Sequence, residues 1–305
     1  MKYTVLTLFP EIIDAYFATS IMAKAIQRGI IGYRAVNIRD YAQDKHKTCD
    51  DATYGGGPGM LMLPGPLALA LEAAGAVRKG ESNCVQEGLD HSRVVQPQRG
   101  EAEDHRMRAE AGGETYPRII YLSPSGKPFS QKMAQELARE TELVLVCGRY
   151  EGIDQRIIDL YVDDEISVGD YVLSSGEVGA LAVIDATYRL VDEVITPESL
   201  EEESFSDGLL EYPQFTRPEI FDSIKVPDVL LSGHHEHIRK WRLEKRVEKT
   251  LRFRPDLICR GRESGIFSKE ICNIIDMAAA GGQFEASDVQ QGEGCSAALN
   301  EGDRK

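Results

Sequence analysis

Apolar and polar residues form regular patterns at the start of the chain. An alternating apolar run over residues 3–8 predicts a β-strand. An apolar period typical of a helix follows over about residues 10–28 and ends at Gly29, and a second strand is predicted around residues 33–38. The chain is therefore expected to open with a strand, a helix and a strand.

Apolar strands and helices also alternate over residues 118–194. The clearest strand is the run LVLVC at 143–147, a shorter apolar run lies at 166–168, and a helix is predicted at 130–140. Alternation of this kind predicts an α/β fold with a parallel sheet. Taken alone, the pattern favours an ordinary doubly wound sheet, because knotted chains are nearly absent among protein folds.

The rest of the chain divides by composition. Residues 79–117 have few large apolar side chains, five Lys or Arg against eight acidic residues and no sustained period, so we expect a flexible insertion. An acidic linker at 195–208 precedes a mainly helical domain at 209–275, and the tail at 276–305 is expected to be disordered. The first domain accordingly spans residues 1–194.

Glycine-rich segments follow both apolar strands. The run at 143–147 leads into GRYEG at 148–152, and the run at 166–168 leads into GDYVLSSG at 169–176. Glycines let a backbone approach a ligand closely, and open α/β sheets bind ligands at the carboxyl ends of their strands. Glycine alone also fits two turns shaped only by chain reversal. Because both loops carry carboxylates, we predict a ligand site.

Several familiar cofactor motifs are absent from the sequence. A dinucleotide fingerprint starting at Gly55 would need glycine in place of Met60, and no G-x-x-x-x-G-K-[ST] phosphate loop occurs. The first strand runs into Pro10 and not into a glycine turn, which disfavours a Rossmann-type methyltransferase. Three histidines at 234–237 lack the H-E-x-x-H spacing, so we expect capping or RNA contact from them and no metal site.

Composition restricts the compartment. No run of 18 or more apolar residues occurs, and the first residues predict a strand and a helix start in place of a signal peptide. The six cysteines contain no C-x-x-C pair, which suits reduced thiols and not a disulfide framework. We therefore expect a cytoplasmic protein with no membrane partner.

The net charge of −15 argues by itself against a nucleic-acid partner. Its distribution is uneven, because residues 235–254 carry eight Lys or Arg against three Glu. Arg239, Arg242, Arg246 and Lys249 follow the i, i+3, i+7, i+10 spacing of one helix face. This face fits either a solvated amphipathic helix or a helix that contacts phosphates.

The motifs themselves carry a family resemblance. GRYEGID at 148–154 followed by SVGDYVLSSGE at 167–177 resembles the bacterial tRNA (guanine-N1)-methyltransferases of the knotted SPOUT superfamily. The resemblance covers residues 1 to about 78 and 118 to about 257. Its other motifs, in the order in which the family has them, are LFPE at 8–11, YGGGPGM at 54–60, YLSP at 121–124, YPQFTRPE at 212–219 and VLLSGH at 229–234 followed by WR at 241–242.

The resemblance implies a fold, a reaction and partners. The expected fold is a SPOUT-type parallel sheet with a deep C-terminal trefoil knot, followed by a small, mainly helical domain. The implied reaction transfers the methyl group of S-adenosylmethionine to N1 of the tRNA guanosine at position 37, just 3′ of the anticodon. A homodimer is implied, with sites completed across its interface. A need for Mg²⁺ is left open, and no dedicated protein site for it is expected.

The same resemblance assigns roles to residues. Backbone groups around the two loops hold the cofactor, Glu151 lies near its cationic end, and Arg189 faces guanine O6. The implied cofactor-binding residues are Tyr121, Leu122, Ser123, Pro124, Gly148, Tyr150, Glu151, Ser167, Val168, Gly169, Asp170, Tyr171, Val172, Leu173 and Gly176. The implied RNA-binding residues are Asp50, Gly55, Gly56, Gly57, Ser232, His234, Arg239, Trp241, Arg242 and Arg246.

The chain departs from the family at the general base. The family has Asp-Ser-Phe in the connector, whereas this chain has Glu203, Ser204 and Phe205. Glu and Asp have similar reference pKa values, about 4.3 and 3.9, so we assign the base to Glu203. The alternatives are a merely solvated acidic run, with Asp207 or a water as the base.

Two further departures lie at the rim of the cofactor loop. Ser175 and Gly179 stand where the family usually has glycine and proline. Two rival functions follow from the departures and the fold: an RNA-binding protein that has lost catalysis, and a knotted methyltransferase that acts on ribose or another base. The motifs at 54–60 and 232–242 argue against the second rival, because they belong to the guanine-N1 family.

Overall fold

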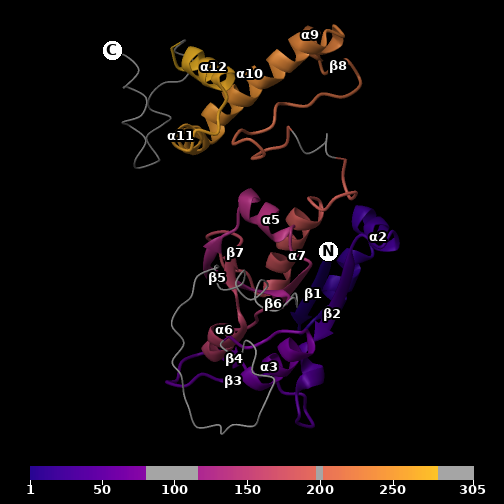
Figure 1. Cartoon of the computed structure of the whole chain (residues 1–305), viewed down its shortest axis with the longest axis vertical. Helices are drawn as coiled ribbons and strands as arrows, with labels where there is room; N and C mark the ends of the chain where they lie inside the picture. Colours follow the sequence, from indigo (N-terminus) through magenta and orange to yellow (C-terminus); the bar gives the residue numbers. More distant parts are fainter. Residues whose placement is uncertain (80–115, 197–201, 281–305) are drawn as a thin grey trace. The chain divides into compact units, whose positions relative to one another are not determined.

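A computed structural model describes residues 1–79, 116–196 and 202–280 of the chain (Figure 1). The chain divides into two compact units, Met1–Ile195 and Thr196–Lys305, and each is described by itself. Most of the insertion predicted at 79–117, part of the linker and most of the tail lie outside the described residues.

The first unit is built on a five-stranded sheet with the order β2-β1-β6-β5-β7. Every neighbouring pair in it is parallel. The predicted α/β fold with a parallel sheet is therefore confirmed. The strands are β1 (Lys2–Thr7), β2 (Gly32–Asn37), β5 (Arg118–Pro128), β6 (Glu142–Cys147) and β7 (Asp164–Ser167).

Helices cover both faces of this sheet, because the central strands present apolar side chains to each side. Along β6, Leu143 and Leu145 belong to one buried cluster, and Val144 and Val146 belong to the other. The first cluster includes residues of α1 (Pro10–Phe17), α2 (Ser20–Gln27), α5 (Gln131–Leu137) and α7 (Gly176–Tyr188). The second includes residues of η1 (Ile38–Tyr41), α3 (Pro64–Ala73) and α6 (Gln155–Tyr161).

The helix predicted over residues 10–28 is wrong in one respect, because it is two helices. Thr19 has an extended backbone between α1 and α2, and its hydroxyl donates to the carbonyl of Tyr16. A threonine side chain that bonds to the local backbone competes with helix continuation. Phe17, at the end of α1, stacks on Tyr33 of β2 at 4.1 Å between ring centroids, which holds the break against the sheet.

The second unit is helical around a small core of its own. Leu209, Val247, Ile258, Phe267, Ile271 and Ile275 are buried together. Its elements are the hairpin of β8 (Ile220–Phe221) and β9 (Ile224–Lys225), α9 (Asp228–Leu231), α10 (His235–Phe253), α11 (Pro255–Glu263) and α12 (Lys269–Ala280). The last helix continues beyond residue 275, where a disordered tail was predicted, because three alanines, the strongest helix formers, follow Met277.

The structure bears on two expectations, the state of the cysteines and the presence of membrane-spanning helices. Among the cysteines of the described residues, Cys49, Cys147 and Cys272 are free thiols. Within residues 1–79, 116–196 and 202–280, no helix is both long enough and apolar enough to cross a membrane.

Candidate active site

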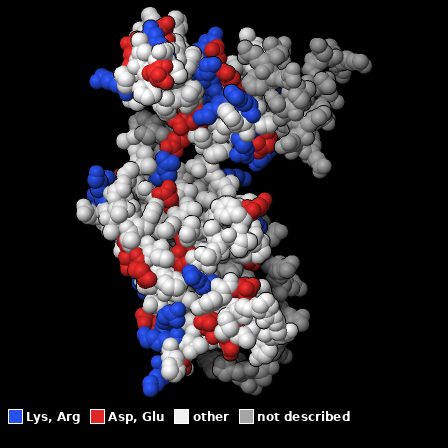
Figure 2. Space-filling model, turned by 180° about the vertical axis from the view of Figure 1, so that it is seen from behind, with Lys and Arg blue, Asp and Glu red and all other residues white. Residues whose placement is uncertain are grey.

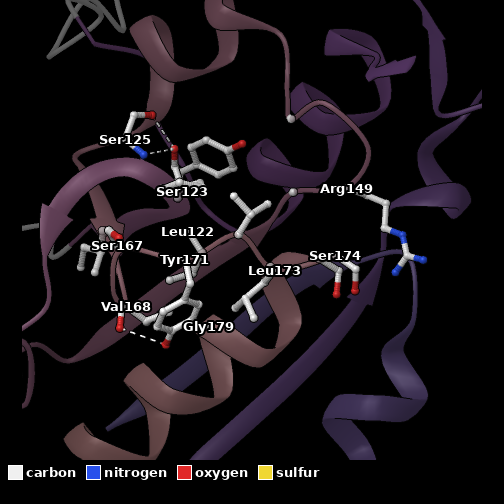
Figure 3. Close-up of a pocket in the computed structure, with 18 of the residues that line it drawn as sticks. Leu122, Ser123, Ser125, Arg149, Ser167, Val168, Tyr171, Leu173, Ser174 and Gly179 are labelled. Atoms are coloured by element: carbon white, nitrogen blue, oxygen red, sulfur yellow. Dashed lines mark hydrogen bonds between the residues drawn. The ribbon is translucent and has the colours of Figure 1, made fainter. Parts of the chain in front are cut away.

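Three loops at the carboxyl ends of neighbouring strands enclose a cavity of about 400 Å³. They comprise residues 121–125 of β5, 148–152 after β6 and 166–176 around the end of β7. Figure 3 shows side chains from these loops converging on the cavity. Its volume lies in the range that small-molecule sites occupy.

Glycines allow the loops to come this close. A Cβ atom at Gly148 would lie 2.9 Å from the Tyr121 ring, and one at Gly176 would lie 2.8 Å from the backbone of Cys147 and Gly148. Gly176 donates its N–H to the carbonyl of Gly148 at 2.9 Å. The first residue of α7 is therefore held against the loop after β6, and a side chain at position 176 would separate them.

The cavity has apolar walls with a few polar groups. Leu122, Tyr171 and Leu173 point toward one another in Figure 3. The Tyr171 hydroxyl donates to the carbonyl of Val168 at 3.1 Å, so the ring is fixed across the loop. On the opposite wall, the Ser123 hydroxyl is 2.7 Å from that of Ser125. Such walls suit a flat apolar ring with a polar edge.

Glu151 contributes a carboxylate to the lining of the cavity. A Cβ atom at Gly59 would lie 2.4 Å from the Oε1 atom of Glu151, and Gly59 has a φ of +96°, so glycine is favoured at position 59. Glu151 also donates its backbone N–H to the carbonyl of Met60 at 3.0 Å.

The Tyr121 phenol, which also lines the cavity, is neutral at neutral pH, since burial raises its pKa further above the ordinary value.

The glycine motif at 54–60 is thus brought next to the cavity. It connects the short antiparallel strands β3 (Asp50–Ala52) and β4 (Met60–Met62), so Asp50 lies at the start of the same hairpin. Gly55, Gly56 and Gly57 all have positive φ, and Tyr54 at the tip is fully exposed. Two motifs that lie far apart in the sequence meet at one edge of the first unit.

Most residues that the sequence assigned to the cofactor line this cavity. Asp170 is the exception and does not line it. The sequence reasoning missed five lining residues, although each lies within or beside a motif that it had identified: Ser125, Arg149, Gly152, Ile166 and Ser174. Ser175 and Gly179, the two departures from the family, also line the cavity.

The two residues assigned to catalysis lie in different units. Arg189 follows the last residue of α7 in the first unit and is half-buried. Glu203 belongs to the second unit, where its carbonyl accepts a hydrogen bond from the Ser206 hydroxyl at 2.8 Å. Asp207, the alternative base, forms a two-pronged ion pair with Arg246.

The predicted basic face of α10 is largely paired with carboxylates. Arg239 bonds to Glu270 at 3.0 Å, and Arg242 bonds to Glu202 at 3.3 Å. Figure 2 accordingly shows blue and red side chains interspersed in the second unit. Arg246 is only 4% exposed and is not part of an exposed face, so its assignment to direct phosphate contact does not fit its burial.

The remaining residues assigned to RNA lie around the start of α10. Ser232 follows α9, His234 precedes α10, and Trp241 lies on α10 with its ring centroid 6.4 Å from that of Phe215. In the part of the chain that the structure describes, no group of three or more His, Cys, Asp or Glu could hold a metal ion.

Comparison with known proteins assigns the chain to a family. The family model described as tRNA (Guanine-1)-methyltransferase TrmD matches residues 1–96 and 93–260. Proteins named tRNA (guanine-N(1)-)-methyltransferase are similar throughout: that of Treponema denticola is 56% identical over 275 residues, which cover 90% of this chain and 98% of the relative. Those of Treponema pallidum (52% over 275 residues, 90% and 95% covered) and Borreliella burgdorferi (48% over 276 residues, 88% and 100%) are close behind. With the glycine loops, the cavity and the matched motifs on one chain, this protein belongs to the tRNA (guanine-1)-methyltransferase TrmD family.

Proposed function

We propose that this protein transfers a methyl group from S-adenosylmethionine to N1 of the guanosine at tRNA position 37, 3′ of the anticodon. The observation that carries the proposal is the cavity of about 400 Å³ at the carboxyl ends of the strands, enclosed by the three motifs that the family shares. Family membership and relatives that carry the same name over most of their length support the reaction class.

The residues of the cavity fit this cofactor. Apolar side chains from Leu122 and Leu173 would cover the adenine, and the backbone of the glycine-rich loops that line the cavity would read its edge. The Glu151 carboxylate is suited to a cationic group. When bound, the sulfonium supplies a methyl group that is already activated, so the protein's task is positioning and electrostatics.

The acceptor needs a base, because neutral guanine N1 carries a proton. We assign its removal to Glu203, and the stabilisation of charge at guanine O6 to Arg189. The rival base Asp207 is disfavoured because both of its oxygens accept hydrogen bonds from the buried Arg246 guanidinium.

The finer architecture is also part of the proposal. We propose that the segments around the cavity form the deep trefoil knot of the SPOUT fold, that the helical domain at 209–275 binds tRNA, and that a cytoplasmic homodimer is the active form. Very close backbone approaches support the knot: a Cβ atom at Gly126 would lie 2.5 Å from the backbone of Glu165 and Ile166. Residues 149 and 175 also form an isolated bridge.

Replacing Gly176 with alanine is expected to weaken cofactor binding at least 10-fold. The new Cβ atom would meet backbone at 2.8 Å and would force α7 away from the loop after β6. Gly179→Ala is the matched control, because it lies on the same helix and also lines the cavity, yet its Cβ atom would meet only Leu122 at an ordinary 3.5 Å. Calorimetric titration with S-adenosylhomocysteine measures both. Equal affinities for the two variants would contradict the assignment of this cavity to the cofactor.

Methyl transfer to a pair of tRNA transcripts tests the proposed function. The transcripts differ only in guanosine or adenosine 3′ of the anticodon, and the donor is labelled in its methyl group. We expect label on the guanosine transcript alone. Label on neither, with cofactor and tRNA still bound, would contradict the proposal and favour an RNA-binding protein that has lost catalysis.

A further inference from the structure

The guanidinium of Arg149 has no assigned role, although the residue lines the cavity. Within the described residues, it has neither an ion pair nor a side-chain hydrogen bond, whereas Arg118 and Arg156 of the same unit are paired with carboxylates. Figure 3 shows its side chain turned away from the cavity walls formed by Leu122 and Tyr171. In a chain of net charge −15, an unpaired cation beside the site calls for a physical reason.

The ring of Phe9 supports this guanidinium. The Cζ atom of Arg149 lies 4.8 Å from the ring centroid, within the range of a cation–π contact. A contact of this kind uses the face of the ring and leaves the N–H groups of the guanidinium as hydrogen-bond donors, which match an anionic oxygen. Phe9 belongs to the LFPE motif at 8–11, to which the proposed reaction gives no role.

Hydrogen bonds of the neighbouring Thr7 hold the backbone of Phe9 in place. Its backbone N–H donates to the Thr7 hydroxyl at 2.9 Å, and that hydroxyl donates to Glu177 Oε1 at 2.6 Å. Glu177 is buried and is the second residue of α7, directly after the cavity-lining Gly176. The backbone of Arg149 is held separately, through its bridge to Ser175. Ring and cation are thus both attached to segments that form the cavity.

We propose that Arg149 binds an RNA phosphodiester next to the target guanosine, with Phe9 as its positioning residue. The inference rests on the proposed function, since it takes tRNA as the substrate. An anionic oxygen could also come from the carboxylate of the cofactor. The RNA phosphate is favoured because the side chain is directed away from the cavity walls. Phosphate contacts from arginine fix the register of a nucleic acid on a protein surface.

The test measures the affinity of the full chain for the guanosine tRNA transcript over a series of salt concentrations. Arg149→Ala is expected to weaken binding about 10-fold, because one charge-assisted contact is lost. It should also reduce the slope of log affinity against log salt by roughly one contact, about 0.7–0.9. Arg149→Lys should keep the slope. Arg156→Ala is the matched control, since that arginine is already paired with Asp154 and should change neither quantity.

Calorimetry with S-adenosylhomocysteine separates the two sources of the anion. Unchanged cofactor affinity in Arg149→Ala supports the RNA contact, whereas a loss confined to cofactor affinity would overturn it in favour of the cofactor carboxylate. An unaltered salt slope, or the same loss in Arg156→Ala, would also overturn the inference. These outcomes leave the proposed function intact if the wild-type protein labels the guanosine transcript. A wild-type protein that binds no tRNA would overturn both.

Discussion

Glu203→Gln is expected to slow methyl transfer by a factor on the order of 10²–10⁴, the usual contribution of a general base. The amide keeps the size of the side chain but cannot accept the N1 proton of guanine. Cofactor affinity should stay near that of the wild type, because the residues that line the cavity all belong to the first unit and Glu203 belongs to the second. Single-turnover transfer to the guanosine transcript, with enzyme in excess, measures the chemical step directly.

Two variants of the same segment serve as controls for Glu203→Gln. Glu202→Gln removes the neighbouring carboxylate, whose partner is Arg242, and should keep transfer within a few-fold of the wild type. Glu203→Asp restores the carboxylate of the family motif one methylene shorter. A misplacement of about 1 Å can cost on the order of 10²-fold in rate, so its activity reports how closely the connector is matched to glutamate. Near-wild-type turnover by Glu203→Gln would contradict the assignment of Glu203 as the general base and would favour a water or Asp207 instead.

The sheet of the first unit could be predicted from the sequence because its central strand, at 143–147, is a compact apolar run. The run at 143–147 is buried on both faces, and the strands predicted over residues 3–8 and 33–38 from local patterns occur as β1 and β2. The break at Thr19 could not be predicted in this way. The helical period continues across it, and the stacking of Phe17 on Tyr33 that accompanies the Thr19 hydrogen bond is a tertiary contact.

The cavity was predictable through motifs and not through geometry. GRYEG and GDYVLSSG mark two of its loops, but the contact between Gly59 and Glu151 joins residues far apart in sequence, and no local pattern indicates it. The same holds for Arg149, which helical or strand spacing does not distinguish from any exposed arginine. Its pairing with Phe9 becomes visible only in space.

The prediction for α10 was limited for a related reason. Helical spacing correctly places Arg239, Arg242 and Arg246 near one side of the helix, but it says nothing about what packs there. The 207–210 segment supplies a carboxylate and a carbonyl to Arg246, and it precedes the helix by some 25 residues in the chain. A basic face predicted from the spacing along one helix can therefore include both solvent-exposed arginines and arginines that are buried against the rest of the protein.

Arg246→Ala is accordingly expected to destabilise the second unit by about 2–3 kcal/mol. The guanidinium donates to both Asp207 oxygens and, at 3.3 Å, to the carbonyl of Leu210, beside the buried Leu209. Its removal leaves these acceptors without their donor, although Asp207 is partly exposed and regains some water. The chain has a single tryptophan, Trp241 on α10, so its fluorescence during urea unfolding reports on this unit.

Arg242→Ala is the matched control for this measurement. Arg242 lies one turn earlier on α10 and is paired with Glu202, but its side chain is 39% exposed, so its loss should cost less than about 1 kcal/mol. A lower urea midpoint for Arg246→Ala alone supports a structural role for the buried arginine. An unchanged midpoint with weakened tRNA binding would contradict that role and restore the phosphate contact that the sequence predicted. The two arginines, which are equivalent by helical spacing, are thus separated by what each one packs against.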